Sequence, residues 1–187
     1  MLNNKPLVSI IMNCYNSDRF LKEAIDSVYE QTYLNWEIIF WDNASNDNSA
    51  NIAKSYDGKI KYYLASKTSP LGEARNFALQ KTRGYYIAFL DCDDIFLPGK
   101  LEKQVNLMQS RDYAMSYGSA VIIDENGKVI KKHIVKNKSG NVFPALLRRY
   151  EINMQTVLLK RDYIISNQLS FNPSMSYCHN CWAQLLS

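Results

Sequence analysis

The chain has 187 residues, of which 47% are hydrophobic and 21% are charged, and its formal net charge is +4. This length and balance are ordinary for one globular domain with its own core. Because lysine and arginine are spread along the chain, the positive charge does not indicate nucleic-acid binding, and we expect no nucleic-acid partner.

The densest basic pairs are Lys131-Lys132 and Arg148-Arg149. Solvated faces would explain both pairs, and a peripheral contact with an anionic membrane surface stays open as the alternative. The four cysteines are too sparse and uneven for a secreted disulfide framework. No apolar run is long enough for a signal peptide or a membrane span. We therefore expect a cytoplasmic location, with the inner face of the membrane as the open alternative.

Short apolar runs alternate with amphipathic stretches through the first 112 residues. The apolar runs are nearly continuous, which is typical of parallel strands buried on both faces. The alternation therefore predicts an α/β fold, with a mostly parallel, Rossmann-like sheet flanked by helices. The expected strands are residues 7–15, 36–42, 59–66 and 85–91, and the expected helices are residues 18–32, 45–56, 71–82 and 101–110.

The pattern becomes irregular from about residue 113. Residues 115–124 and 128–135 flank Asn126-Gly127, a dipeptide that suits the tight turn of a β-hairpin. Beyond the hairpin we expect short helices at 142–150 and 161–168 around a strand at 154–160. The whole chain, 1–187, is thus predicted to be one domain in two parts, 1–112 and a smaller hairpin and helical part, 113–187.

Polar residues follow three of the predicted strands. The first strand ends in Asn13-Cys14-Tyr15-Asn16, the second in Asp42-Asn43, and the fourth in Asp91-Cys92-Asp93-Asp94. Ligands of open α/β sheets bind outside the carboxyl ends of the strands. We therefore expect these side chains to share one strongly negative edge of the sheet.

Carboxylates gathered in this way repel one another unless a cation compensates them. Mg²⁺ and Mn²⁺ prefer oxygen ligands, and Mg²⁺ needs only one or two carboxylates when phosphates and water complete its shell. The pattern favours half of a metal site that a diphosphate completes. A capped turn after each strand is the alternative for any single aspartate.

Four blocks of the sequence, in this order, resemble the family 2 glycosyltransferases. They are VSIIMNCYN, WEIIFWDNASNDNS, LGEARNFAL and GYYIAFLDCDD. The resemblance covers about the first hundred residues well and continues weakly to the end. It implies the GT-A fold and transfer of a sugar from a nucleotide-sugar donor, with residues 1–112 binding the donor and residues 113–187 forming an incomplete acceptor side.

The resemblance also implies roles for five residues. Tyr15 would line the uracil pocket, and Asp42 would hydrogen-bond the base. Arg75 would lie near the diphosphate or the donor sugar. Asp91 would lie close to the ribose, the sugar or the metal, and Asp93, the second acid of the D-x-D motif, would be the main ligand of Mn²⁺ or Mg²⁺.

Each role has a structural alternative. Tyr15 could be a packing aromatic, and Asp42 could cap the following turn. Arg75 could form a surface ion pair with Glu73 or be solvated. For Asp94 we favour a supporting or capping role over direct ligation.

The sequence departs from the family pattern at three places. Asn43 stands where an acid is common, and it can still hydrogen-bond. Cys92 occupies the middle of D-x-D, where we expect a buried packing thiol. Inverting members of the family usually have an acidic pair just before a tryptophan-containing helix, and its aspartate is the general base. Here Trp182 places Cys178 or His179 at that position, and neither is a carboxylate.

The predicted function is inverting transfer of a sugar from a metal-bound UDP-sugar to a hydroxyl of a saccharide or lipid-linked acceptor, in cell-surface polysaccharide or glycolipid synthesis. The alternative is an inactive, donor-binding homologue that lacks the general base. The chain stops at Ser187, where most relatives continue, which would fit a shortened member. A nucleotidyltransferase or a dinucleotide-binding domain would need a glycine-rich loop after the first strand, and NCYNSDRF has no glycine.

Overall fold

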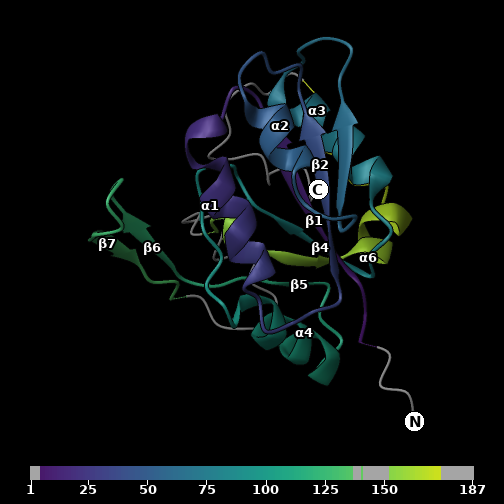
Figure 1. Ribbon diagram of the computed structural model, residues 1–187. Helices are drawn as coiled ribbons and strands as arrows, with labels where there is room; N and C mark the ends of the chain where they lie inside the picture. The colour runs from purple at the N-terminus through teal and green to yellow at the C-terminus, as the bar shows by residue number, and fades with distance from the viewer. Residues whose placement is uncertain (1–4, 137–139, 141–151, 174–187) are drawn as a thin grey trace.

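The computed structural model describes residues 5–136, 140 and 152–173. Within these residues one six-stranded sheet has the strand order β3-β2-β1-β4-β8-β5, and β6 and β7 form a separate two-stranded sheet (Figure 1). The strands are β1 (Val8–Cys14), β2 (Trp36–Asp42), β3 (Ile60–Leu64), β4 (Tyr86–Phe89), β5 (Met115–Ser116), β6 (Ala120–Ile123), β7 (Val129–His133) and β8 (Leu158–Lys160). The helices are α1 (Asp18–Tyr29), α2 (Ser49–Lys54), α3 (Leu71–Lys81), α4 (Lys100–Ser110), α6 (Arg161–Ser166) and the short 3₁₀ helix η1 (Met154–Thr156).

The predicted alternation of strands and helices is confirmed. β1 lies between β2 and β4 and runs parallel to both, and β3 runs parallel to β2. Every residue of β4 is buried, and β1 and β2 are buried except for one half-buried residue each. Strands of this kind read as continuous apolar runs because both faces of the sheet are covered.

Helices cover both faces of the sheet. One core cluster joins α1, α2 and α4 to one face, and a second joins α3, α6 and η1 to the other (Figure 1). No helix in the described ranges is both long and apolar enough to cross a bilayer.

The predicted strand at 154–160 is wrong over its first half. The Asn153 side chain accepts a hydrogen bond from Gln155 N (3.1 Å), which caps a 3₁₀ turn over Met154–Thr156. Only Leu158–Lys160 is extended, and it pairs antiparallel with β4 and with β5. The sheet is therefore mostly parallel, as predicted, with an antiparallel margin. The predicted helix at 142–150 lies outside the described residues, and α6 confirms the helix at 161–168.

The predicted hairpin is confirmed as β6 and β7. Gly127 has φ of 77° in the turn, a conformation that glycine adopts without strain, and its N–H donates to Asp124 O (3.0 Å). The first residues of the predicted segment, Met115–Ser116, instead join the large sheet as β5.

Helix α4 begins with a half-buried lysine, Lys100. Lys100 Nζ donates to Gln104 Oε1 (2.8 Å) and lies 4.0 Å from the centroid of the Phe96 ring. Burial lowers the pKa of Lys100 to about 7, from 10.5 for an ordinary lysine.

This shift predicts a pH dependence of stability. Between pH 7 and 10.5 the unfolded chain binds more protons at Lys100 than the folded chain does, so stability rises with pH in that window by up to about 1.4 kcal/mol per pH unit. We expect Lys100→Met to be more stable than the wild type at pH 7, and the difference to shrink by about 2 kcal/mol towards pH 9. Urea unfolding of both proteins at several pH values measures this, and parallel profiles would contradict it.

Candidate functional site at the carboxyl edge of the sheet

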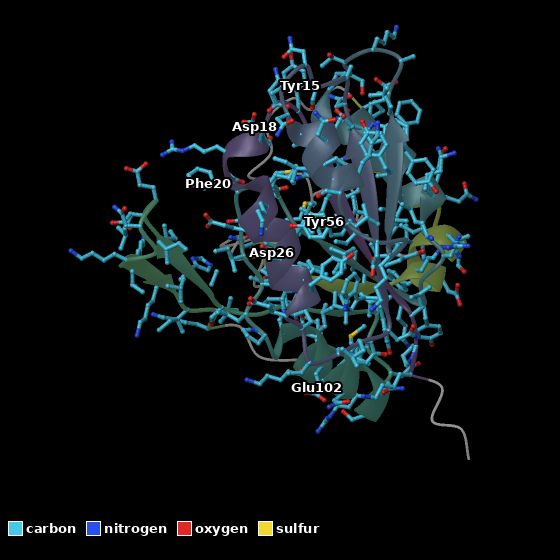
Figure 2. All side chains as sticks on the ribbon, viewed as in Figure 1. Tyr15, Asp18, Phe20, Asp26, Tyr56 and Glu102 are labelled. Atoms are coloured by element: carbon cyan, nitrogen blue, oxygen red, sulfur yellow. The ribbon has the colours of Figure 1, made fainter. Side chains whose placement is uncertain are left out.

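The predicted negative edge is present where β2, β1 and β4 end. Cys14 at the end of β1 pairs in register with Asp42 at the end of β2. The chain after β4 continues beside β1, because Leu90 N donates to Ile11 O (3.0 Å). Tyr15 and the Asp91 segment therefore follow neighbouring strands at one edge. Figure 2 shows Tyr15 at the upper end of the molecule, opposite Glu102 of α4.

Hydrogen bonds hold the loop after β1 against the loop after β2. Asn16 N donates to Ser45 Oγ (3.1 Å), and Asn46 N donates to Asn16 Oδ1 (2.9 Å). Tyr15 precedes this junction and is 52% exposed. That exposure does not fit the alternative of a packing aromatic, and it leaves the ring accessible to a ligand.

Asp42 is fully buried. Its Oδ1 accepts from Ser45 N (2.8 Å), and its Oδ2 accepts from Tyr62 Oη (2.5 Å). Burial, and then this carboxylate, raise the pKa of Tyr62 above its usual value. Asp42 thus caps its turn in this conformation. Base recognition by Asp42 stays a prediction, and it requires Tyr62 or the Ser45 loop to move.

Asn43 has a role that an acid could not fill. Its Nδ2 donates to Ser69 O (2.8 Å), while its Oδ1 accepts from Ser69 N (3.1 Å). A carboxylate offers only acceptors, so Asp at this position would repel Ser69 O. Asn43, which departs from the family pattern, thus holds the segment before α3 against the edge of the sheet.

Arg75 and Asp91 form a partly buried ion pair. Arg75 lies on α3, is 4% exposed, and its Nη2 is 3.4 Å from Asp91 Oδ1. Burial lowers the pKa of Arg75, and burial also raises the pKa of Asp91 even though Arg75 opposes that change. The alternative that Arg75 is solvated or paired with Glu73 at the surface is therefore wrong.

Contacts from residues 155 and 171 support this pair, and no sequence pattern predicted them. Gln155 Nε2 donates to Asp91 Oδ2, so η1 also supports this carboxylate. Asn76, next to Arg75, donates to Phe171 O and accepts from Phe171 N, both at 2.8 Å. The Phe171 ring centroid lies 5.7 Å from the Arg75 guanidinium carbon. Segments far apart in the chain thus fix the position of Arg75.

Asp93 differs from its neighbours because it is exposed. Among the described residues, no hydrogen bond or ion pair engages its carboxylate. Asp94 is half-buried, and its pKa is raised to about 6 by burial and then by the charges of Asp91 and Asp93. An oxygen-only set with this excess of negative charge fits a hard divalent cation. In the described part of the chain, no group of three or more His, Cys, Asp or Glu side chains could hold a metal ion by itself.

Cys92 is buried, as predicted for a packing thiol. Its Sγ donates to Asn13 O (3.4 Å). The neighbouring Cys92 side chain is the main cause that lowers the pKa of Cys14 to about 7. The predicted base candidates Cys178 and His179, with Trp182, lie outside the described residues.

Known proteins are similar to this chain in sequence and in fold. The family model for glycosyl transferase family 2 matches residues 9–183. UDP-Glc:alpha-D-GlcNAc-diphosphoundecaprenol beta-1,3-glucosyltransferase WfgD of Escherichia coli is 36% identical over 166 residues, which cover 88% of this chain and 64% of that enzyme. The chain spans less than two thirds of the length of the first curated relatives it matches.

Two solved structures show the same fold at low identity. The S. aureus TarS fragment 1-349 in complex with UDP-GlcNAc has a TM-score of 0.74 and 20% identity, over 88% of this chain and 48% of that one. Mannosyltransferase PcManGT from Pyrobaculum calidifontis, in complex with GDP-Man and Mn2+, has a TM-score of 0.66 and 18% identity, over 92% of this chain and 49% of that one. The sequence match over most of the chain, on a fold shared with these glycosyltransferases, shows that the chain belongs to glycosyl transferase family 2.

Proposed function

We propose that this chain binds a UDP-sugar at the edge formed by β2, β1 and β4 and transfers the sugar, with inversion, to a hydroxyl of a saccharide or lipid-linked acceptor. The observation that carries the proposal is the exposed Asp93 carboxylate, which lies next to the Arg75–Asp91 pair. UDP-GlcNAc bound to TarS and the UDP-Glc in the name of WfgD support the choice of donor.

Each residue at the edge formed by β2, β1 and β4 would contact a different part of the donor. Tyr15 offers an exposed ring to the uracil, and Asp42 is the candidate for hydrogen bonding to the base. Arg75, held by Asp91, supplies N–H donors towards the diphosphate or the donor sugar, and Asp91 also lies close to the ribose, the sugar or the metal. Residues 1–112 would form this donor half and residues 113–187 the acceptor side.

Asp93 would hold Mn²⁺ or Mg²⁺, which would neutralise the diphosphate as it leaves. The bound Mn2+ of PcManGT supports this choice of cofactor. In the reaction, an acceptor oxygen forms a bond to the anomeric carbon from one face while the bond to UDP breaks on the other. The acceptor proton passes to a general base, for which Cys178 and His179 are the candidates in this chain.

The diphosphoundecaprenol acceptor named for WfgD supports a place in cell-surface polysaccharide or glycolipid synthesis. We infer from it that the chain works in the cytoplasm at the inner face of the membrane. The second candidate function is a binding-only homologue, which the absence of a carboxylate at the Cys178 and His179 positions favours.

A thermal-shift panel tests the donor site. We expect UDP with Mn²⁺ to raise the melting temperature of the wild type by about 5 °C or more at a hundredfold excess over Kd. UDP alone, and GDP or CDP with Mn²⁺, should raise it less. Asp93→Ala should lose the Mn²⁺-dependent part of the shift.

Asp112→Ala is the matched control, because Asp112 is an exposed aspartate that pairs with Lys160 away from the edge. It should respond as the wild type does. If Asp93→Ala keeps the full shift with UDP and Mn²⁺, the site assignment fails. Release of UDP from a UDP-sugar in the presence of an acceptor separates the two functions, since the binding-only homologue would show the shift without turnover.

A further inference from the structure

The strands of the β6–β7 hairpin lie apart from the large sheet, and an ion pair between Glu125 and Arg19 of α1 holds its turn. The hairpin forms its own two-stranded sheet and projects to one side, beyond the helices that cover the large sheet (Figure 1). A hairpin of two strands is marginal in water unless a hydrophobic face is covered. The side chains exposed on the hairpin therefore indicate which kind of partner covers it.

The hairpin presents a run of exposed β-branched side chains. Six of them are 40–66% exposed: Val121, Ile122, Ile123, Val129, Ile130 and Ile134. We call this set the hairpin patch. Apolar side chains gathered at this density on a small projection mark an interaction site.

The strand register shows how the patch is arranged. Val121 pairs with Lys132, and Ile123 pairs with Val129, so these four side chains share one face. Ile122 pairs with Lys131 on the opposite face. Each lysine is therefore set among aliphatic side chains, and Lys128 lies at the end of the turn.

This composition fits a lipid surface better than a protein surface. Residues 120–136 contain no aromatic residue, no methionine and no arginine, whereas protein interfaces are enriched in these and depleted in lysine. Aliphatic side chains can enter the headgroup region while lysine stems extend to anionic headgroups. Four exposed lysines in this segment, Lys128, Lys131, Lys132 and Lys136, complement such a surface.

The acidic residues of the hairpin are engaged at its turn. Asp124 Oδ1 accepts from Asn126 N (3.0 Å) and Lys128 N (2.9 Å), and Glu125 forms an ion pair with Arg19 (2.5 Å). Arg19 is in the first turn of α1, shortly after Tyr15. These two carboxylates therefore lie at the turn, near the loop that follows β1. We call the edge formed by β2, β1 and β4 the donor edge. The two strands of the hairpin, which we call its flank, carry most of the hairpin patch and two of the lysines and are free of acidic side chains.

We propose that the flank of the β6–β7 hairpin docks on an anionic lipid bilayer. Docking would place the donor edge next to the surface that holds a lipid-linked acceptor, and this consequence rests on the proposed function. The docking itself depends only on the hairpin patch and its lysines.

Co-sedimentation of the full chain with vesicles tests the proposal. We expect binding to phosphatidylcholine vesicles that contain one third phosphatidylglycerol, weakening with salt, and little binding to phosphatidylcholine alone. Lys131→Glu/Lys132→Glu should reduce the partition coefficient about tenfold or more. Lys103→Glu/Arg111→Glu changes the net charge equally at exposed positions of α4 and its end, and it should stay within about twofold.

The apolar half of the patch has its own variant. Val121→Thr/Val129→Thr keeps the β-branched shape and removes apolar surface, so it should bind the anionic vesicles several-fold less while melting as the wild type does. Equal losses in Lys131→Glu/Lys132→Glu and in Lys103→Glu/Arg111→Glu would show that only the net charge matters, and would overturn the proposal.

Two other results would also overturn the proposal. One is the absence of vesicle binding together with an oligomer, seen by sedimentation velocity, that the threonine variant dissociates, because a second copy would then cover the patch. The other is the absence of vesicle binding with a lowered melting temperature of that variant, because the rest of the chain would then cover it. Vesicle binding needs no nucleotide, so its failure is distinct from failure of the donor site.

Discussion

Arg75→Ala is expected to lower the free energy of unfolding by about 3 kcal/mol. Arg75 is almost fully buried, and its guanidinium compensates Asp91, whose pKa burial already raises. Removing one partner of such a pair leaves a partly buried charge without compensation, which costs more than the pair itself contributes. The effect should appear as a lower urea midpoint with an unchanged m-value.

A double-mutant cycle tests this explanation. If the cost arises from the uncompensated Asp91 carboxylate, Asp91→Asn should recover part of the stability that Arg75→Ala removes. The matched control is Arg19→Ala, which breaks an exposed arginine–carboxylate pair with Glu125 and should cost about 1 kcal/mol or less. A loss for Arg75→Ala as small as that for Arg19→Ala would show that Asp91 is compensated by solvent.

The burial of Arg75 could have been predicted from its helix. Gly72, Arg75 and Ala78 recur every third residue, and all three are buried on α3. Small residues one turn before and after a long side chain indicate a helix face that lies close to its neighbours. The partner Asp91 could be expected from the same edge of the sheet, but Gln155 could not. Gln155 lies in the segment predicted to be a strand, and the Asn153 side chain instead caps a 3₁₀ turn there.

The donor edge was predictable in outline because adjacent parallel strands end together, and the register of Cys14 with Asp42 fixes that geometry. Its hydrogen bonding was not predictable. Whether Asp42 faces solvent depends on Tyr62, which is twenty residues away on β3 and donates to it. Likewise, the sequence shows Asn43 only as the loss of a negative charge. The structure shows that its side-chain amide hydrogen-bonds to both the N–H and the carbonyl of Ser69. Contacts between loops carry no periodic signal in the sequence.

Gly84→Ala is expected to be among the most damaging single changes, with a loss of about 3 kcal/mol or a failure to fold. Gly84 precedes β4, and the sequence showed it only as a break before that strand. A Cβ here would lie 2.5 Å from Ser9 N and 2.8 Å from Ser9 Oγ. Because Ser9 N belongs to the backbone of β1, β1 and β4 would have to separate. Those two strands place Tyr15 and Asp91.

The side chain of Ser9 offers a way to locate the clash. Its Oγ accepts from Gly84 N (2.8 Å) and donates to the buried Glu37 carboxylate (2.7 Å). Ser9→Ala removes the Oγ contact but leaves the backbone nitrogen in place, so Ser9→Ala/Gly84→Ala should remain at least as unstable as Gly84→Ala. Gly58→Ala, where a new Cβ meets no atom within 4 Å, is the control, and it should stay within about 0.5 kcal/mol of the wild type. If thermal and urea unfolding show Gly84→Ala as close to the wild type as Gly58→Ala, β1 and β4 can separate at low cost, and the close approach does not hold the donor edge together.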